Sequence, residues 1–228
     1  MTSRTPGSSA SGDPTTTPHV DAPRPARLAP AFEGAAFDVV AIAGGTGAVV
    51  ALRELFVGLP DGFPAAVVVL LHWPADMPLK LGSLERRSVL PITLAEEGQS
   101  LRPASVFLAP PGRHLLIKPN GSFALTETPR VHFVRPSADL LFASLAATCG
   151  HRAIAVILSG SGSDGSVGVR FIRAAGGTVI AQNWATAEQF PMPLMPIAAI
   201  HTGCVDHVLP IQQIAPSLVS LVNQYHSQ

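Results

Sequence analysis

The sequence predicts an α/β fold, a doubly wound and mostly parallel sheet with helices on both faces and an added antiparallel hairpin. From residue 37 onward, short apolar runs rich in Val, Ile and Leu alternate with segments of helical periodicity, which is typical of strands covered on both faces. The chain has 228 residues, 47% of them hydrophobic and 13% charged, enough for one sizeable core. A glycine-rich segment at residues 42–48 separates the first apolar run from the first helical one, as turns at the carboxyl edge of such sheets do.

Strands are expected where apolar and β-branched residues run together between turn residues. Those of the parallel sheet are predicted at residues 37–43, 65–71, 106–109, 153–158 and 178–181. Residues 114–118 and 122–126 flank Pro119-Asn120-Gly121. They predict the hairpin, because Asn-Gly adopts the positive φ angles of a tight turn.

Helices are expected between these strands, at residues 49–59, 79–87, 137–149, 166–175, near 193–200 and at 211–224. Ser137 follows Pro136 and precedes a run of leucines, so it is expected to cap an amphipathic helix. Pro196 and Pro216 count against the last two helices, because proline fits a helix without cost only in the first turn.

Residues 1–36 are predicted to be a disordered tail, and residues 37–228 a single folded domain. The tail is rich in Ser, Thr, Pro, Ala and Gly and has few large apolar side chains. Such a segment cannot bury enough apolar surface to offset the entropy lost on ordering.

The overall charge and the cysteines exclude several classes of function. The formal net charge is zero, which gives no long-range attraction for nucleic acid or an acidic membrane surface. Cys149 and Cys204 lack the spacing of a metal site, and no metal or cofactor is expected. No apolar run approaches the roughly 20 residues of a membrane-spanning helix, and no secretory signal is visible. A cytoplasmic protein without membrane insertion is therefore expected.

A dinucleotide site is one interpretation of the glycine-rich turn, since glycines there let a phosphate approach the helix amides. The third glycine of that fingerprint is missing after Gly47. The second strand also ends in His72 and Trp73 rather than in an acid that could hold a ribose. The pattern therefore argues against a nicotinamide enzyme.

His72 and Asp164 are the candidate chemical groups at the same edge of the sheet. His72 closes the apolar strand at 65–71, and Asp164 lies in Ser-Gly-Ser-Gly-Ser-Asp-Gly after the strand at 153–158. Taken alone, a histidine at a strand end such as His72 is more often a structural hydrogen-bonding residue than a base. Asp164 can cap a helix and orient His72 at the same time. A turn, a histidine and an aspartate at one sheet edge are parts of a hydrolase site that lacks its nucleophile.

These segments resemble the methylesterase domain of the CheB protein-glutamate methylesterase family, which modifies chemotaxis receptors. The similarity runs from Asp38 to about Val222, and it is carried by the strand ending in His72 and by S-G-S-G-S-D-G at 159–165. Further collinear matches are A-L-R-E-L-F at 51–56, S-V-L-P at 88–91, L-R-P-A-S-V-F-L-A-P-P-G-R-H-L at 101–115, V-R-P-S-A-D at 134–139, A-A-G-G-T-V-I-A-Q at 174–182 and C-V-D-H-V-L-P at 204–210.

The resemblance implies a doubly wound α/β domain that hydrolyses receptor glutamate methyl esters and deamidates receptor glutamines through a Ser-His-Asp triad. By match, His72 is the general base and Asp164 the acid that orients it. The family serine stands in a pattern A-S-T-G-G after the first strand, and here Gly45 occupies its position. Loss of such a nucleophile lowers turnover by roughly 10⁶, so weak or absent hydrolysis is expected.

Two nearby hydroxyls and a water molecule are alternative nucleophiles. Thr46 adjoins Gly45, but successive side chains leaving a strand point in different directions. Ser161 stands where the family has a methionine in the aspartate-bearing turn. Water activated by His72 would be the third route. The family pattern is also altered at Gly44, at Ala48 and at residues 190–193, Phe-Pro-Met-Pro.

The leading interpretation is a CheB-type domain that has lost its nucleophile and binds methyl-accepting chemoreceptor helices or another signalling protein. The competing interpretation is an active ester or amide hydrolase that uses Thr46, Ser161 or a His72-activated water. The family enzyme usually carries an N-terminal receiver domain. The 36 residues ahead of the first strand are too few for one, so regulation by another protein, or none, is expected.

Overall fold

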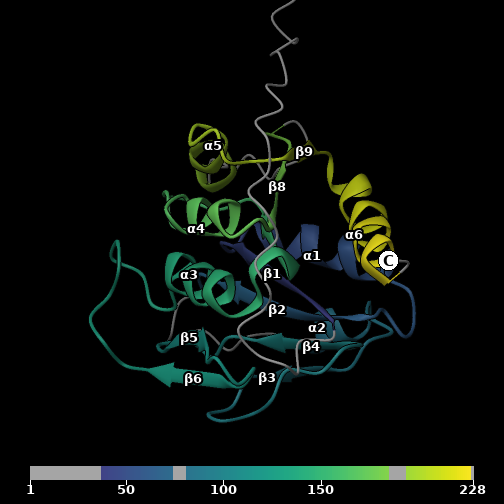
Figure 1. Ribbon diagram of the computed structural model, residues 1–228, viewed down its shortest axis with the longest axis horizontal. Coiled ribbons are helices and arrows are strands. Elements are labelled where there is room, and N and C mark those ends of the chain that lie inside the picture. The colour runs from purple at the N-terminus through teal and green to yellow at the C-terminus, as the bar shows by residue number, and fades with distance from the viewer. Residues whose placement is uncertain (1–36, 74–80, 185–193, 227–228) are drawn as a thin grey trace, which may run out of the picture.

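A parallel sheet of seven strands, in the order β3-β4-β2-β1-β7-β8-β9, forms the centre of the domain (Figure 1). The computed structural model describes residues 37–73, 81–184 and 194–226. The central strands are β1 (Asp38–Gly44), β2 (Ala65–Leu71) and β7 (Ala153–Ile157), and every neighbouring pair in the sheet is parallel. The outer strands are β4 (Ser105–Leu108) and β3 (Ile92–Leu94) on one side, and β8 (Thr178–Gln182) and β9 (His207–Leu209) on the other.

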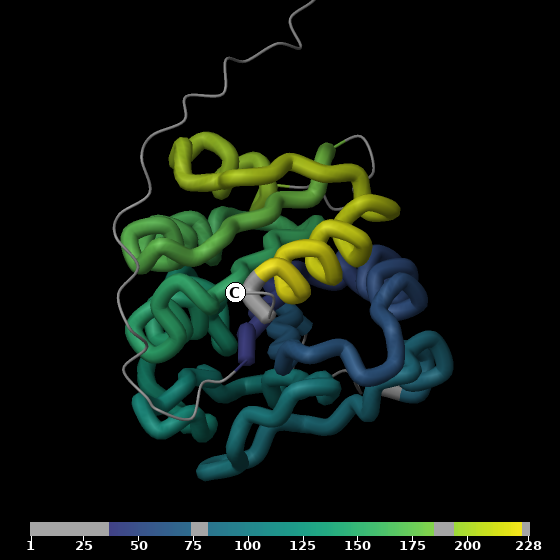
Figure 2. The backbone as a smooth tube through the Cα atoms, turned by 45° about the vertical axis from the view of Figure 1, so that its right-hand side comes forward, coloured from purple at the N-terminus to yellow at the C-terminus, as the bar shows by residue number. Residues whose placement is uncertain are grey.

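Helices cover both faces of this sheet, which confirms the predicted doubly wound α/β class. α1 (Ala48–Val57) and α6 (Ile211–His226) lie side by side on one face (Figures 1 and 2). α3 (Ala138–Cys149) and α4 (Gly168–Ala174) pack together on the other. The short helices are α2 (Leu81–Glu85), the 3-10 turn η1 (Gly150–Arg152) and α5 (Leu194–Ile200).

Alternate residues of β1 feed two separate hydrophobic cores. Ala41 and Ala43 pack with the buried faces of α3 and α4, whereas Val40 and Ile42 pack with α1 and α6. All seven residues of β1 are buried, and all but Asp38 at its start are apolar or glycine, as expected for a strand inside a covered parallel sheet.

The predicted hairpin is present, but it forms a sheet of its own rather than extending the parallel one. β5 (His114–Ile117) and β6 (Phe123–Thr126) pair only with each other, in antiparallel register. Ile117 ties the hairpin to α3, because its N–H donates to Ser144 Oγ at 3.0 Å and its carbonyl accepts from Thr148 Oγ1 at 3.2 Å. The hairpin therefore completes the α3 side of the core.

The remaining differences from the sequence prediction are local. β3 and β9 have three residues each, too few to show a strand periodicity. α6 continues through Pro216, whose side chain is exposed, so the hydrogen bond that proline cannot make faces water. The expected tail at 1–36 and the altered residues 190–193 lie outside the described residues. Among the described helices, none is both long and apolar enough to cross a membrane.

Candidate active site

The carboxyl ends of β1, β2 and β7 are joined by backbone hydrogen bonds that continue beyond the strands. His72 N–H donates to Gly44 O at 2.8 Å, and Gly45 N–H donates to Ser159 O at 2.9 Å. These two bonds hold the glycine-rich turn, the histidine and the loop after β7 at one edge. The neighbouring strand ends expected from the sequence are thus brought together.

His72 and Asp164 form a direct hydrogen bond across this edge, with 2.8 Å between His72 Nε2 and Asp164 Oδ2. The aspartate is 3% exposed and the histidine side chain 14% exposed. An ionised carboxylate can only accept, so Nε2 carries the proton in this contact. The lone pair of the neutral ring is then on Nδ1, which makes no hydrogen bond to any described residue.

Asp164 is held by the beginning of α3 rather than by its own helix. Its carboxylate accepts from Ser137 Oγ at 2.9 Å, from Ala138 N–H at 2.6 Å and from Asp139 N–H at 3.1 Å. The expectation that Ser137 caps α3 through its own side chain is therefore wrong. Ser137 occupies the N-cap position without such a bond, and the carboxylate of Asp164 satisfies the first amides instead.

Asp139, in the first turn of α3, caps the start of α4 in the same way. Its Oδ1 accepts from Val167 N–H at 3.0 Å and from Gly168 N–H at 2.7 Å. Its other oxygen, Oδ2, is buried without a hydrogen bond and lies 3.8 Å from His132 Nε2. The start of α3 is therefore capped by Asp164 from the loop before α4, and the start of α4 by Asp139 from α3.

The two carboxyl groups have pKa values shifted in opposite directions. Burial works to raise the pKa of Asp164, but hydrogen bonds from His72 and from the Ala138 and Asp139 amides outweigh it and lower the pKa. For Asp139, burial raises the pKa and the nearby charge of Asp164 adds to this, against the lowering effect of the Gly168 amide. Asp164 is thus the carboxylate kept ionised beside His72.

At Gly45, the position that the sequence comparison above matched to the family serine, there is no side-chain atom. The residue is buried, and a Cβ added there would lie 3.0 Å from Gly160 Cα and 3.6 Å from Ser161 N. A side chain at this position would therefore fit only closely against the loop after β7. Glycine has no hydroxyl that could give up a proton to His72.

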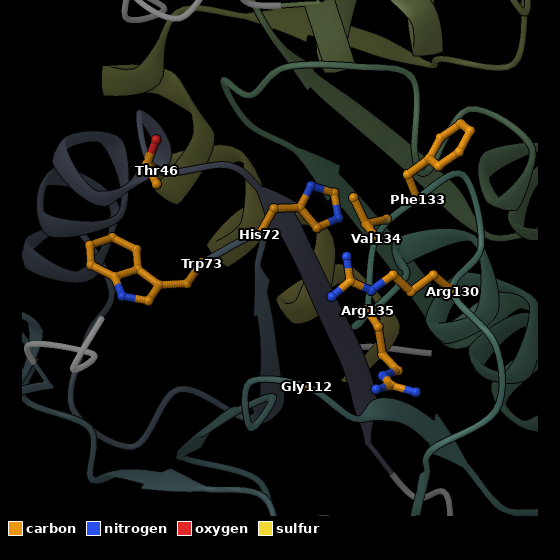
Figure 3. Close-up of a pocket in the computed structure, with 8 residues that line it drawn as sticks. All are labelled: Thr46, His72, Trp73, Gly112, Arg130, Phe133, Val134 and Arg135. Atoms are coloured by element: carbon orange, nitrogen blue, oxygen red, sulfur yellow. The ribbon is translucent and has the colours of Figure 1, made fainter. Parts of the chain in front are cut away.

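Thr46 and Ser161, the two alternative hydroxyls, both lie near this edge and are exposed. Neither makes a hydrogen bond to His72, whose ring is bonded to Asp164 alone within the described part of the chain. In Figure 3 the Thr46 hydroxyl points away from the imidazole. As they stand, neither hydroxyl is placed for activation by this histidine.

A cavity of about 370 Å³ opens beside His72. Two arginines line it together with apolar and small residues, and the described lining contains no acidic side chain. The described lining residues are Thr46, His72, Trp73, Gly112, Arg130, Phe133, Val134 and Arg135 (Figure 3). Among the described residues, a ligand in this cavity would therefore meet only neutral and cationic side chains.

One wall of the cavity is the segment 127–135, which the sequence did not predict as part of the site. It folds back through reciprocal backbone bonds between Val131 and Val134, of 3.1 and 2.9 Å, with His132 and Phe133 at φ values of 48° and 67°. Arg135 Nη1 donates to Glu127 O and to Thr128 O at 2.8 and 3.0 Å. The only sequence signal for this wall was V-R-P-S-A-D at 134–139.

The sequence from β1 to α6 matches a known family. The family model for CheB methylesterase matches residues 40–218. The chain belongs to the CheB methylesterase family. Among solved structures, the CheB methylesterase catalytic domain of Thermotoga maritima superposes with a TM-score of 0.78 at 34% identity, covering 82% of this chain and 99% of that one.

Curated CheB proteins give the same result by sequence. A protein-glutamate methylesterase/protein-glutamine glutaminase of Moorella thermoacetica is 40% identical over 193 residues, which cover 81% of this chain and 44% of that protein. One from Anaeromyxobacter dehalogenans is 37% identical over 190 residues, covering 82% and 52%. The chain thus spans about half the length of these curated CheB relatives.

The described part of this CheB domain contains no group of three or more His, Cys, Asp or Glu side chains that could hold a metal ion. Cys149 is buried, and burial raises the pKa of its thiol to about 12, which makes it a poor nucleophile. The chemistry available at the described edge is thus that of the His72–Asp164 pair, the turn amides and the two arginines.

Proposed function

We propose that this CheB domain binds chemoreceptor or related signalling segments that carry glutamate side chains, and that its hydrolysis of glutamate methyl esters and deamidation of glutamines are weak or absent. The observation that supports the proposal is the intact His72–Asp164 hydrogen bond of 2.8 Å, taken together with the sequence match that puts Gly45 at the position of the family serine. A base without an adjacent hydroxyl cannot form an acyl-enzyme.

The turn before α1 retains the features that would stabilise an anion. The amides of Thr46 and Gly47 make no hydrogen bond to the described residues, and they stand at the N-terminal end of a helix of ten residues. Free amides at such a position favour negative charge. The domain would therefore keep the capacity to bind a carboxyl, ester or amide group beside His72.

The second candidate function is an active ester or amide hydrolase. The observation that favours it is the free Nδ1 of His72, a residue that lines the cavity, where it could activate a water molecule in place of a serine. Thr46 and Ser161 are the other candidates, but either would require a rearrangement to reach the histidine.

Measuring methanol release from a methyl-esterified chemoreceptor tests the proposal. The purified native domain is expected to release no more methanol than the His72→Ala variant. Release by the native domain that disappears in His72→Ala would contradict the proposal and support the hydrolase. Release retained in both would assign the activity to a contaminant rather than to this site, and a repeat with repurified protein would then decide between the two functions.

The cellular setting is part of the same proposal. We place the domain in the cytoplasm, in chemotaxis-like phosphorelay signalling, with a chemoreceptor or another signalling protein as its partner, and without nucleic acid, membrane insertion, metal or cofactor.

A further inference from the structure

The cavity beside His72 has a charge distribution suited to a free carboxylate. Its described lining includes Arg130 and Arg135 and no Asp or Glu. Two acidic residues that contact the lining residues His72 and Arg135 are already engaged, because the Asp164 carboxylate accepts from His72 and from the start of α3, and the Glu127 carboxylate pairs with Arg113 at 3.0 Å. Among the described lining residues, no acidic side chain neutralises this positive charge.

Of the two arginines, Arg130 is the one free to bind a ligand. It is exposed and makes no ion pair or hydrogen bond to a described residue. Figure 3 shows its guanidinium reaching across the cavity toward the His72 ring. Arg135 is instead fixed by its bonds to two carbonyls of the same segment, and its Nε is buried without a partner. Arg135 thus holds segment 127–135 in place, and Arg130 supplies the positive charge that faces the cavity.

The wall that carries Arg130 is anchored at both ends. His114 on β5 is fully buried, and its Nε2 bonds to Pro129 O at 3.1 Å, directly before Arg130. On the other side, the paired Val131 and Val134 hold Phe133 at the rim, where it is 92% exposed. A bulky apolar side chain so exposed next to a cationic cavity gives an apolar surface for the stem of an acidic side chain or its neighbours.

We propose that this cavity binds the free γ-carboxylate of a peptide glutamate, with Arg130 as the charge-reading residue, so that the domain distinguishes glutamate from its methyl ester. The inference deepens the proposed function and rests on it. The methyl ester and the amide are neutral, whereas the carboxylate can accept charge-assisted hydrogen bonds from a guanidinium. A domain that binds without hydrolysing would then report the unmodified state of its partner.

The test is an NMR titration of the ¹⁵N-labelled domain with a short capped alanine peptide containing one central glutamate. The same peptide is used as the γ-methyl ester and with glutamine in place of glutamate. The acid is expected to bind about tenfold more tightly than either neutral form, the value of one charge-assisted contact near the surface. Amide signals of Gly112 and Phe133, both in the lining, should shift.

Arg130→Ala is expected to bring the ratio of acid to ester affinity to about one, and Arg130→Lys to retain part of it, because lysine keeps the charge but loses the planar fork. Arg102→Ala is the matched control. It removes another exposed arginine just ahead of β4, at the opposite edge of the sheet, and should leave the ratio unchanged. Higher salt should lower the ratio in the native domain.

Equal binding of acid and ester, tighter binding of the ester, equal losses in Arg102→Ala and Arg130→Ala, or no binding of any peptide would each overturn the inference. Methanol measured in the ester samples reports separately on the proposed function. Release together with a preference for the acid would contradict the loss of hydrolysis and leave the carboxylate inference standing. Equal binding of acid and ester without methanol release would overturn the carboxylate inference and leave the loss of hydrolysis standing.

Discussion

Asp164 caps the helix that contains Asp139, and Asp139 caps the helix that follows Asp164. Asp164, in the loop ahead of α4, accepts the first amides of α3, and Asp139, in α3, accepts the amides of Val167 and Gly168 at the start of α4. The exchange locks the two helix starts together. Because Asp164 also accepts from His72, the orientation of the imidazole is linked to the packing of both helices.

Replacing Asp164 with Asn is predicted to destabilise the fold by about 2–4 kcal/mol, because the amide loses charge-assisted bonds and brings an NH₂ group against other donors. Urea unfolding of the native and variant domains measures the change. Asp61→Asn, which alters an exposed aspartate, serves as the control and is expected to change the free energy of unfolding by less than about 0.5 kcal/mol. Equal effects of the two variants would contradict the capping role.

The change in unfolding free energy caused by Asp139→Asn is predicted to depend on pH in the opposite direction to the change caused by Asp164→Asn. The raised pKa of Asp139 means that its ionisation weakens the fold once the pH rises above the pKa of the unfolded chain, and Asn avoids this loss. The lowered pKa of Asp164 gives a stabilising effect that is present above its unfolded pKa and is lost as the pH falls through the folded pKa.

The measurement is the difference in unfolding free energy between variant and native protein from about pH 3 to pH 7. The Asp139→Asn variant should gain stability relative to the native domain as the pH rises, and Asp164→Asn should lose it. Parallel changes in the two variants would show that the assigned pKa directions are wrong.

Two glycines of the loop after β7 offer a matched pair for testing the tightness of the site. Gly165 has φ of 94°, and a Cβ there would lie 2.8 Å from Ile157 Cδ1. Gly162 has φ of 83° with open space around it. Gly162→Ala is expected to cost about 1 kcal/mol from backbone strain, and Gly165→Ala roughly 3 kcal/mol from strain and overpacking together. Thermal unfolding compares the variants, and equal costs would show that the loop is not closely packed at Gly165.

Much of the fold could be predicted because buried strands of a parallel sheet occur in the sequence as nearly continuous apolar runs. The strand at 65–71 was predicted with the bounds of β2, and His72 was expected next to the glycine turn because parallel strands end at a common edge. The wall at 127–135 could not be predicted. Its turn places His132 and Phe133 at positive φ, where a sequence signal would have required Gly or Asn.

The capping of α3 by Asp164 and of α4 by Asp139 could not be predicted from the sequence, for a different reason. Ser137 and Asp164 both occupy positions typical of local N-caps, and local pattern reading assigns each to its own helix. The bonds from Asp164 to α3 span 25 to 27 residues of chain. Arg130 carried no motif at all, and only the folded wall shows that it faces His72.

The central claim is that the missing side chain of Gly45 separates this domain from an active esterase, and restoring the serine tests it most directly. Gly45→Ser places Cβ 3.0 Å from Gly160 Cα, so the backbone must shift by a few tenths of an ångström. Gly45→Ala is the matched control, because it makes the same contact without supplying a hydroxyl. Thermal unfolding establishes that both variants fold.

The measurement is methanol release from a methyl-esterified chemoreceptor by the native domain, Gly45→Ser, Gly45→Ala and the double variant with His72→Ala. We predict release by Gly45→Ser alone, and its loss when His72 is also replaced. Release by the native domain that matches Gly45→Ser and depends on His72 would contradict the account, because the domain would then hydrolyse esters without the serine.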